Sequence, residues 1–198
     1  NALGASVSRN FNVAIGNNAC LVQTGDCYST AVGDSTLAAN TSGANNVAVG
    51  RLALAANTTG THNTAVGSGA LDASTTGSDL TAVGYNVLGA NTTGYSNVGV
   101  GGSATYLAAA LSTNTTGYGN TAVGSGAMAA TTTASSNVAV GRQSMYANTT
   151  GSNNVAVGQA ALALNTTAGN NVAIGMNALT VNTTGTENVA VGGLTLDA

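Results

Sequence analysis

Only a few side chains in this 198-residue chain could do chemistry. His62 is the one histidine, so a Ser-His-Asp arrangement would have to be built around it, yet no matching carboxylate is near it in the sequence. A solvated turn histidine is therefore the better interpretation. The six carboxylates fall in unrelated positions and suggest no pair for glycoside hydrolysis: Asp26, Asp34, Asp72, Asp79, Glu187 and Asp197.

The sequence also gives little support for a metal or cofactor site. Calcium-binding β-roll repeats need an aspartate in every unit, and the units of this chain do not have one. A phosphate-binding loop needs a lysine after its glycine, and the chain contains no lysine. We therefore predict a protein that is not an enzyme and that has no catalytic residue, metal ion or cofactor.

The composition excludes two classes of partner. Charged residues make up 5% of the chain, against about 25% in an average domain, and the net charge is −3. No basic stripe is present to neutralise phosphates, so we expect no nucleic-acid partner. The apolar runs are too short to span a bilayer, so we expect no membrane insertion.

An internal repeat predicts the secondary structure that holds these side chains in place. The motif Asn-Val-Ala-Val-Gly recurs with its glycines 17 residues apart, except for one step of 23. Seventeen residues are too few for a helix pair but suit one coil of a β-solenoid. We predict a single all-β repeat domain over 1–198, a parallel β-solenoid of about eleven 17-residue coils with an insertion at 102–113. Such a domain is expected to be a piece of a longer fibrous protein.

Alternation within each motif predicts which residues face the core. The residues one and three positions before the repeat glycine are Val, Ile or Thr, and residues two apart on a strand face the same way. We predict that they point inward, with the core formed by Val49, Val66, Val83, Val100, Val123, Val140, Val157, Ile174 and Val191. The alanine between them, replaced once by Gly99, is expected on the opposite face, close to another chain.

Two asparagine columns are predicted to form ladders in which each amide bonds to the next coil. The first column, which opens the motif, is Asn46, Asn63, Asn97, Asn120, Asn137, Asn154, Asn171 and Asn188. The second is Asn40, Asn57, Asn91, Asn114, Asn148, Asn165 and Asn182. Residues of the second column also fit the acceptor pattern for N-glycosylation, but a tight turn favours the same residues, so we prefer the structural interpretation.

The unit Asn-Val-Ala-Val-Gly-x-x-Ala-Leu-x-x-Asn-Thr-Thr-Gly resembles repeats of bacteriophage tail fibres and of large bacterial surface proteins. Its core, as in Asn12 to Gly16 and Asn171 to Gly175, is similar to head repeats of trimeric autotransporter adhesins. The resemblance implies a left-handed β-roll wound by each of three chains around a common axis and displayed outside the cell. It carries over no catalytic residue.

We therefore expect a structural and adhesive segment of an extracellular, cell-surface or virion fibre. Its partners would be further copies of itself, as a homotrimer or filament, and a cell-surface glycan or protein receptor. An ice-binding solenoid is the first alternative, although the two threonine columns of the Asn-Thr-Thr-Gly turn are adjacent in sequence and would point to opposite faces. A tailspike-like glycan hydrolase is the second alternative.

The two cysteines, Cys20 and Cys27, lie in the first two units. For an extracellular rod, we predict that they form a disulfide with each other. The alternatives are two buried thiols, or a metal pair that lacks further ligands.

Overall fold

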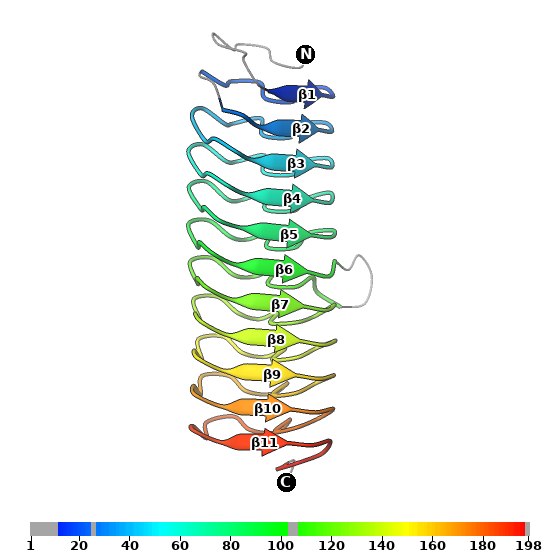
Figure 1. The fold of residues 1–198 in the computed structure, drawn as a ribbon, viewed down its shortest axis with the longest axis vertical. Coiled ribbons are helices and arrows are strands. Elements are labelled where there is room, and N and C mark those ends of the chain that lie inside the picture. The colour runs from blue at the N-terminus through cyan, green and yellow to red at the C-terminus, as the bar shows by residue number, and fades with distance from the viewer. Residues whose placement is uncertain (1–11, 25–26, 103–106, 197–198) are drawn as a thin grey trace.

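The computed structural model describes residues 12–24, 27–102 and 107–196, and none of these residues is helical. Eleven strands of three residues stack one above the next (Figure 1) and pair in chain order as one parallel sheet. The strands are β1 (Val13–Ile15), β2 (Thr30–Val32), β3 (Val47–Val49), β4 (Thr64–Val66), β5 (Thr81–Val83), β6 (Val98–Val100), β7 (Thr121–Val123), β8 (Val138–Val140), β9 (Val155–Val157), β10 (Val172–Ile174) and β11 (Val189–Val191). The predicted all-β parallel solenoid is confirmed.

The repeat glycine ends each strand for two physical reasons. These glycines have φ between +125° and +139°, which is a region that side chains with a Cβ rarely adopt. They also stack closely, because a Cβ on Gly50 would lie 2.6 Å from the carbonyl carbon of Gly67 in the next coil. Any other residue would both strain the corner and push the coils apart.

The coil resumes its regular path after the insertion. Val98 pairs with Thr121 in the same register as every other strand pair, although 23 residues separate them. The Leu88 N–H donates to the Ala110 carbonyl at 3.2 Å, and Leu111 is fully buried, as leucines of the regular coils are. Within the insertion predicted at 102–113, residues 103–106 lie outside the described residues.

The faces of the strands are the reverse of the sequence prediction. Ala48, Ala65 and their equivalents in β2 to β11 are buried, while the valines beside them are half-buried or exposed, and Ala14 in β1 is half-buried. The nine residues predicted to point inward therefore lie on the outer face: Val49, Val66, Val83, Val100, Val123, Val140, Val157, Ile174 and Val191. The prediction that the alanine column approaches another chain is wrong for the same reason.

The width of the coil explains why alanine is inside. At Gly99, the single glycine in the alanine column, an added Cβ would lie 2.6 Å from Val87 Cγ1 and 3.5 Å from Leu88 Cδ1. Val87 stands where other coils carry alanine, such as Ala70, and it fills the space of the methyl that Gly99 lacks. The 3.5 Å distance to Leu88 is ordinary contact, so the leucine side of the coil leaves room for a methyl group and little more. The small residue is required by packing within the chain.

The leucine side of the coil is a column of large side chains held in an unusual backbone conformation. Its φ values lie between 48° and 54° at Leu37, Leu54, Leu71, Leu88, Leu111, Met128, Met145, Leu162, Leu179 and Leu196. A left-handed conformation costs a residue with a Cβ about 1–2 kcal/mol. Full burial of a leucine side chain, as at Leu54, contributes about 1.5–3 kcal/mol and offsets that cost.

Candidate functional site

The outer strand face is a regular surface that runs along all eleven strands. We define it as the first and third residues of strands β1 to β11, all of which are Val, Ile or Thr. Exposed fractions are 37% at Val66 and 38% at Val83, and they rise to 66% at Val191 in the last strand. The face is thus a continuous, uncharged and largely apolar strip along the stack.

The first asparagine ladder lies directly behind this face. Asn137 Nδ2 donates to Asn120 Oδ1 at 3.2 Å and to the Gly151 carbonyl at 3.0 Å. Asn137 Oδ1 accepts from the backbone N–H of Asn154 at 2.9 Å. Side-chain bonds of this kind occur at all eight predicted positions: Asn46, Asn63, Asn97, Asn120, Asn137, Asn154, Asn171 and Asn188.

The second ladder occupies the Asn-Thr-Thr-Gly turn and is buried. Asn57 Nδ2 donates to Asn40 Oδ1 at 2.8 Å and to the Gly60 carbonyl at 3.1 Å. Six of the seven predicted residues have no exposed surface, which leaves no access for a glycan: Asn40, Asn57, Asn91, Asn114, Asn148 and Asn165. This burial supports the structural interpretation over glycosylation.

Substituted positions break the second ladder. Ser74 and Thr131 stand where asparagine would continue it, and the preceding amide oxygens, Asn57 Oδ1 and Asn114 Oδ1, are buried without a hydrogen-bond partner. The Ser74 hydroxyl is itself buried and unpaired. An asparagine at position 74 could therefore restore the missing hydrogen bond to Asn57.

We expect Ser74→Asn to stabilise the protein by about 1 kcal/mol, because the new amide can donate to Asn57 Oδ1 as Asn57 donates to Asn40. Thermal unfolding followed by circular dichroism would show a melting temperature higher by about 2–4 °C. Ser74→Ala is the matched control and should be close to neutral, since it only removes an unpaired hydroxyl. Equal melting temperatures for the two variants would contradict the ladder mechanism.

The cysteines are thiols in the structure, so it does not contain the predicted disulfide. Cys20 occupies the position of the buried leucines, with φ of 48° and no exposed surface, and Cys27 is also buried. Burial, and secondarily the neighbouring Cys27, raise the pKa of the Cys20 thiol to about 11. Because other coils bury a leucine at this position, its surroundings are apolar and disfavour the charged thiolate, so the thiol stays protonated.

We expect Cys20 to resist iodoacetamide in the folded protein at pH 8 and to react once the chain is denatured. A pKa raised above its unfolded value stabilises the fold at low pH, and this contribution is lost between about pH 9 and 11. Intact-mass analysis after alkylation gives the measurement, and Cys20→Ala should reduce the loss of stability above pH 9. Rapid alkylation of native Cys20, or a mass indicating an internal disulfide, would contradict this expectation.

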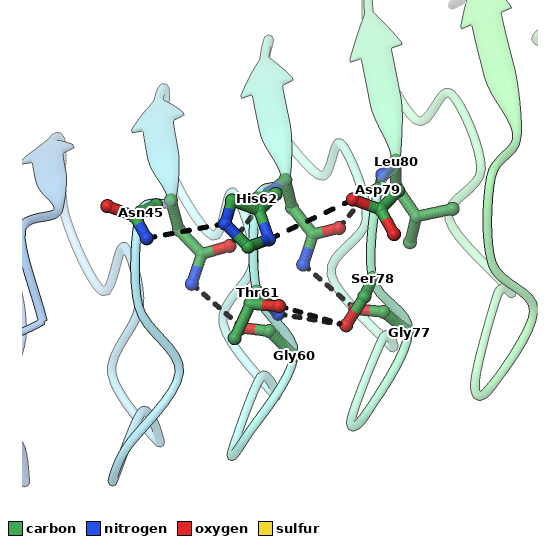
Figure 2. A network of polar contacts seen from close by, with 10 residues as sticks. Asn45, Gly60, Thr61, His62, Gly77, Ser78, Asp79 and Leu80 are labelled. Atoms are coloured by element: carbon green, nitrogen blue, oxygen red, sulfur yellow. Dashed lines mark hydrogen bonds and ion pairs between the residues drawn. The ribbon is translucent and has the colours of Figure 1, made fainter.

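His62 has neighbours that the sequence analysis missed. Asp79 follows His62 by one repeat, so the two side chains stand side by side on adjacent coils, with His62 Nδ1 3.8 Å from Asp79 Oδ1 (Figure 2). On the other side, Asn45 Nδ2 lies 3.4 Å from His62 Nε2. A spacing of one period was the signal that could have found this group. The same spacing brings Arg51 within 4.0 Å of Asp34.

Hydroxyl groups lie next to this row in the same turns. The Thr61 N–H donates to Ser78 Oγ at 3.0 Å, and the two hydroxyl oxygens are 3.4 Å apart (Figure 2). The serine is therefore engaged with Thr61, and the structure gives it no hydrogen bond to His62 among the described residues. This arrangement lacks the base-to-nucleophile contact of a catalytic triad.

The described carboxylates are spread along and around the rod. Asp79 and Glu187 share one column but stand six coils apart, while Asp34 and Asp72 belong to other columns. Burial raises the pKa of Asp72, partly opposed by backbone hydrogen bonds to its own N–H and that of Ala73. Asp26 and Asp197 lie outside the described residues. No cluster of three or more His, Cys, Asp or Glu side chains suited to a metal ion occurs within 12–24, 27–102 and 107–196.

Two tyrosines continue the column of Thr61 and Ser78 on the next two coils. The rings of Tyr95 and Tyr118, one coil apart, are stacked with centroids 4.9 Å apart and planes 3° from parallel. Their exposed fractions are 49% and 44%. The turn that precedes the strands thus displays aromatic rings, hydroxyls, a carboxylate and an imidazole on consecutive coils.

These features define a parallel β-solenoid with one apolar outer face and one polar, partly aromatic edge. Comparisons with protein-family models, with curated proteins and with solved structures found no match. Across the described part of the chain, there is no helix of the length and apolarity needed to cross a membrane.

Proposed function

We propose that this chain is a structural and adhesive segment of an extracellular or virion fibre, assembled as a homotrimer through the outer strand face. The observation that carries the proposal is the unbroken run of Val, Ile and Thr on that face across all eleven strands. Large contiguous apolar surfaces on a protein mark interaction sites. The resemblance to tail-fibre and adhesin repeats points in the same direction.

A second copy of the chain is the partner that best fits this face. The face carries no charge, so two copies brought together create no repulsion and leave no ion unpaired. Its repeat is the spacing between strands, about 4.8 Å, so parallel copies can match along their whole length. Each face measures about 50 Å by 10 Å, so three copies that turn these faces toward a common axis bury about 1,500 Å² in all, an area comparable with that of a standard specific interface.

The rod itself supplies the mechanical part of the function. Neighbouring coils are tied by backbone bonds of the sheet and, over most of the rod, by buried asparagine amides, as at Asn137 and Asn154. Such a stack is stiff because each repeat contacts only its neighbours and forms a continuous core with them. A stiff, weakly charged rod can hold binding surfaces at a fixed distance from a virion or cell.

Light scattering tests the assembly. We expect the folded protein to have three times the mass of one chain, and Val140→Asp, which places a carboxylate on the outer face, to give folded monomers. Thr150→Asp is the control, because this exposed threonine belongs to the Asn-Thr-Thr-Gly turn, away from the strands, and should leave the mass unchanged. A wild-type monomer, or a trimer that tolerates Val140→Asp, would refute the proposed interface.

Ice binding is the second candidate, and one observation favours it. From the sequence, we expected only one threonine column to lie on a flat surface. The outer strand face has two outward columns, and the column of first strand residues includes Thr30, Thr64, Thr81 and Thr121. Seven of the eleven first strand residues are valine, however, and this apolar character favours a protein partner over ordered water. Thermal hysteresis of the purified protein would reverse this preference.

A further inference from the structure

The Tyr95 and Tyr118 pair leaves one ring face uncovered by aromatic carbon. Tyr118 stacks on one side of Tyr95. On the other side, the preceding coil carries Ser78 in the same column, and a serine side chain is much shorter than a tyrosine ring. A flat ring stacked on this outer face of Tyr95 would therefore lie beyond the Ser78 hydroxyl, at the level of the Ser78 coil.

An unpaired backbone donor faces the same space. Along this column, an N–H bonds to the hydroxyl of the next coil, as the Thr61 N–H does to Ser78 Oγ and the Tyr118 N–H does to Ser135 Oγ at 3.1 Å. The parallel register aims the Ser78 N–H in the same way, toward Tyr95, which offers no oxygen there. Within the described residues, this N–H makes no hydrogen bond. A ligand with a hydroxyl group could accept it.

Acceptors and further hydroxyls surround this position. The Asp79 side chain is 63% exposed and lies in the turn next to Ser78, beside His62. The Thr61 and Ser78 hydroxyls form a pair on the same turns (Figure 2). The surface thus presents an apolar ring face on one coil and donors and acceptors on the two coils before it, and polar groups placed beside an apolar surface orient a ligand.

We infer that this edge, formed by Tyr95, Ser78, Asp79 and Thr61, binds a neutral carbohydrate with one pyranose ring stacked on Tyr95. A pyranose with equatorial hydroxyls has an apolar C–H face for the aromatic ring and hydroxyls around its rim for Ser78 and Asp79. The net charge of −3 and the Asp79 carboxylate oppose anionic sugars and nucleic acids. The inference deepens the proposed adhesive function and rests on it for its biological meaning.

Titration of the full chain with cellohexaose, a neutral β-linked glucose oligomer, tests the inference by calorimetry and by shifts of tyrosine ring resonances. We expect saturable binding that Tyr95→Ala weakens about tenfold or more, while Tyr95→Phe retains it because the ring face remains. Tyr85→Ala is the matched control, since Tyr85 is 52% exposed but follows Gly84 at a different corner of the coil. Its affinity should equal that of the wild type.

Two results would overturn the inference. One is the absence of saturable cellohexaose binding by the folded protein, and the other is equal affinity in Tyr95→Ala and Tyr85→Ala. Light scattering on the same samples separates this failure from failure of the proposed function. A trimer that binds no sugar contradicts only the site at Tyr95, whereas a monomer that binds sugar contradicts only the assembly.

Discussion

Asn137→Ala is expected to lower the free energy of unfolding by about 2–4 kcal/mol. The substitution leaves the buried Asn154 N–H without its acceptor, at a cost of about 1–3 kcal/mol, while the Gly151 carbonyl still accepts from Asn148 Nδ2. It also removes packed atoms from the interior, which adds a cavity cost. Guanidinium denaturation at fixed protein concentration, followed by circular dichroism, gives the measurement.

Thr150→Ala serves as the control for Asn137→Ala. Thr150 is exposed, and its side chain makes no hydrogen bond among the described residues. Its change should stay within about 0.5 kcal/mol, as is usual for surface substitutions. Similar losses in the two variants would mean that the buried amides add no net stability and that the coils are held by the sheet and the leucine column alone.

Ala139→Leu is the second large effect, expected to destabilise the protein by about 1–3 kcal/mol or to prevent folding. Ala139 has no exposed surface and lies in register between Ala122 and Ala156. At Gly99 an added Cβ would already be in van der Waals contact with Leu88 Cδ1, at 3.5 Å, so the leucine column leaves little space for a side chain larger than alanine. Chemical denaturation would measure the loss.

The control for Ala139→Leu lies one residue away. Val138→Thr changes the outward neighbour to a residue that already occupies this position in β2, β4, β5 and β7, so it should be tolerated. If the core were instead on the valine side, Val138→Thr would be the more damaging of the two. The pair of variants therefore tests the orientation of the strand directly.

The fold was largely predictable because a fixed period is a strong constraint. Equal spacing of the Asn-Val-Ala-Val-Gly motif requires equivalent residues to stack, and the register of Val47 with Thr64 and Ala48 with Ala65 follows from it. The same argument predicted that Asn137 and Asn154 would bond to each other. It also contained the His62 and Asp79 pair, which one-period spacing identifies once the coils are known to stack.

The cysteines could not be decided in this way. The presence of two cysteines and the expected extracellular location favoured a disulfide. Pairing, however, depends on where each side chain points within its coil. Cys20 takes the inward leucine position in a left-handed backbone conformation, which periodicity alone does not reveal for a non-glycine residue. The same holds for Leu54, whose φ of 51° is compatible with the chain only because the coil buries its side chain.

By itself, the sequence determined the period, the parallel stacking and the residues that share a column. Only the tertiary structure decided which side of the strand is the interior. An alternation of two along a strand separates Val138 and Val140 from Ala139 but does not say which group is inside. Packing against the leucine column decides this, because the space that remains inside a 17-residue coil admits a methyl group and excludes the larger valine side chain.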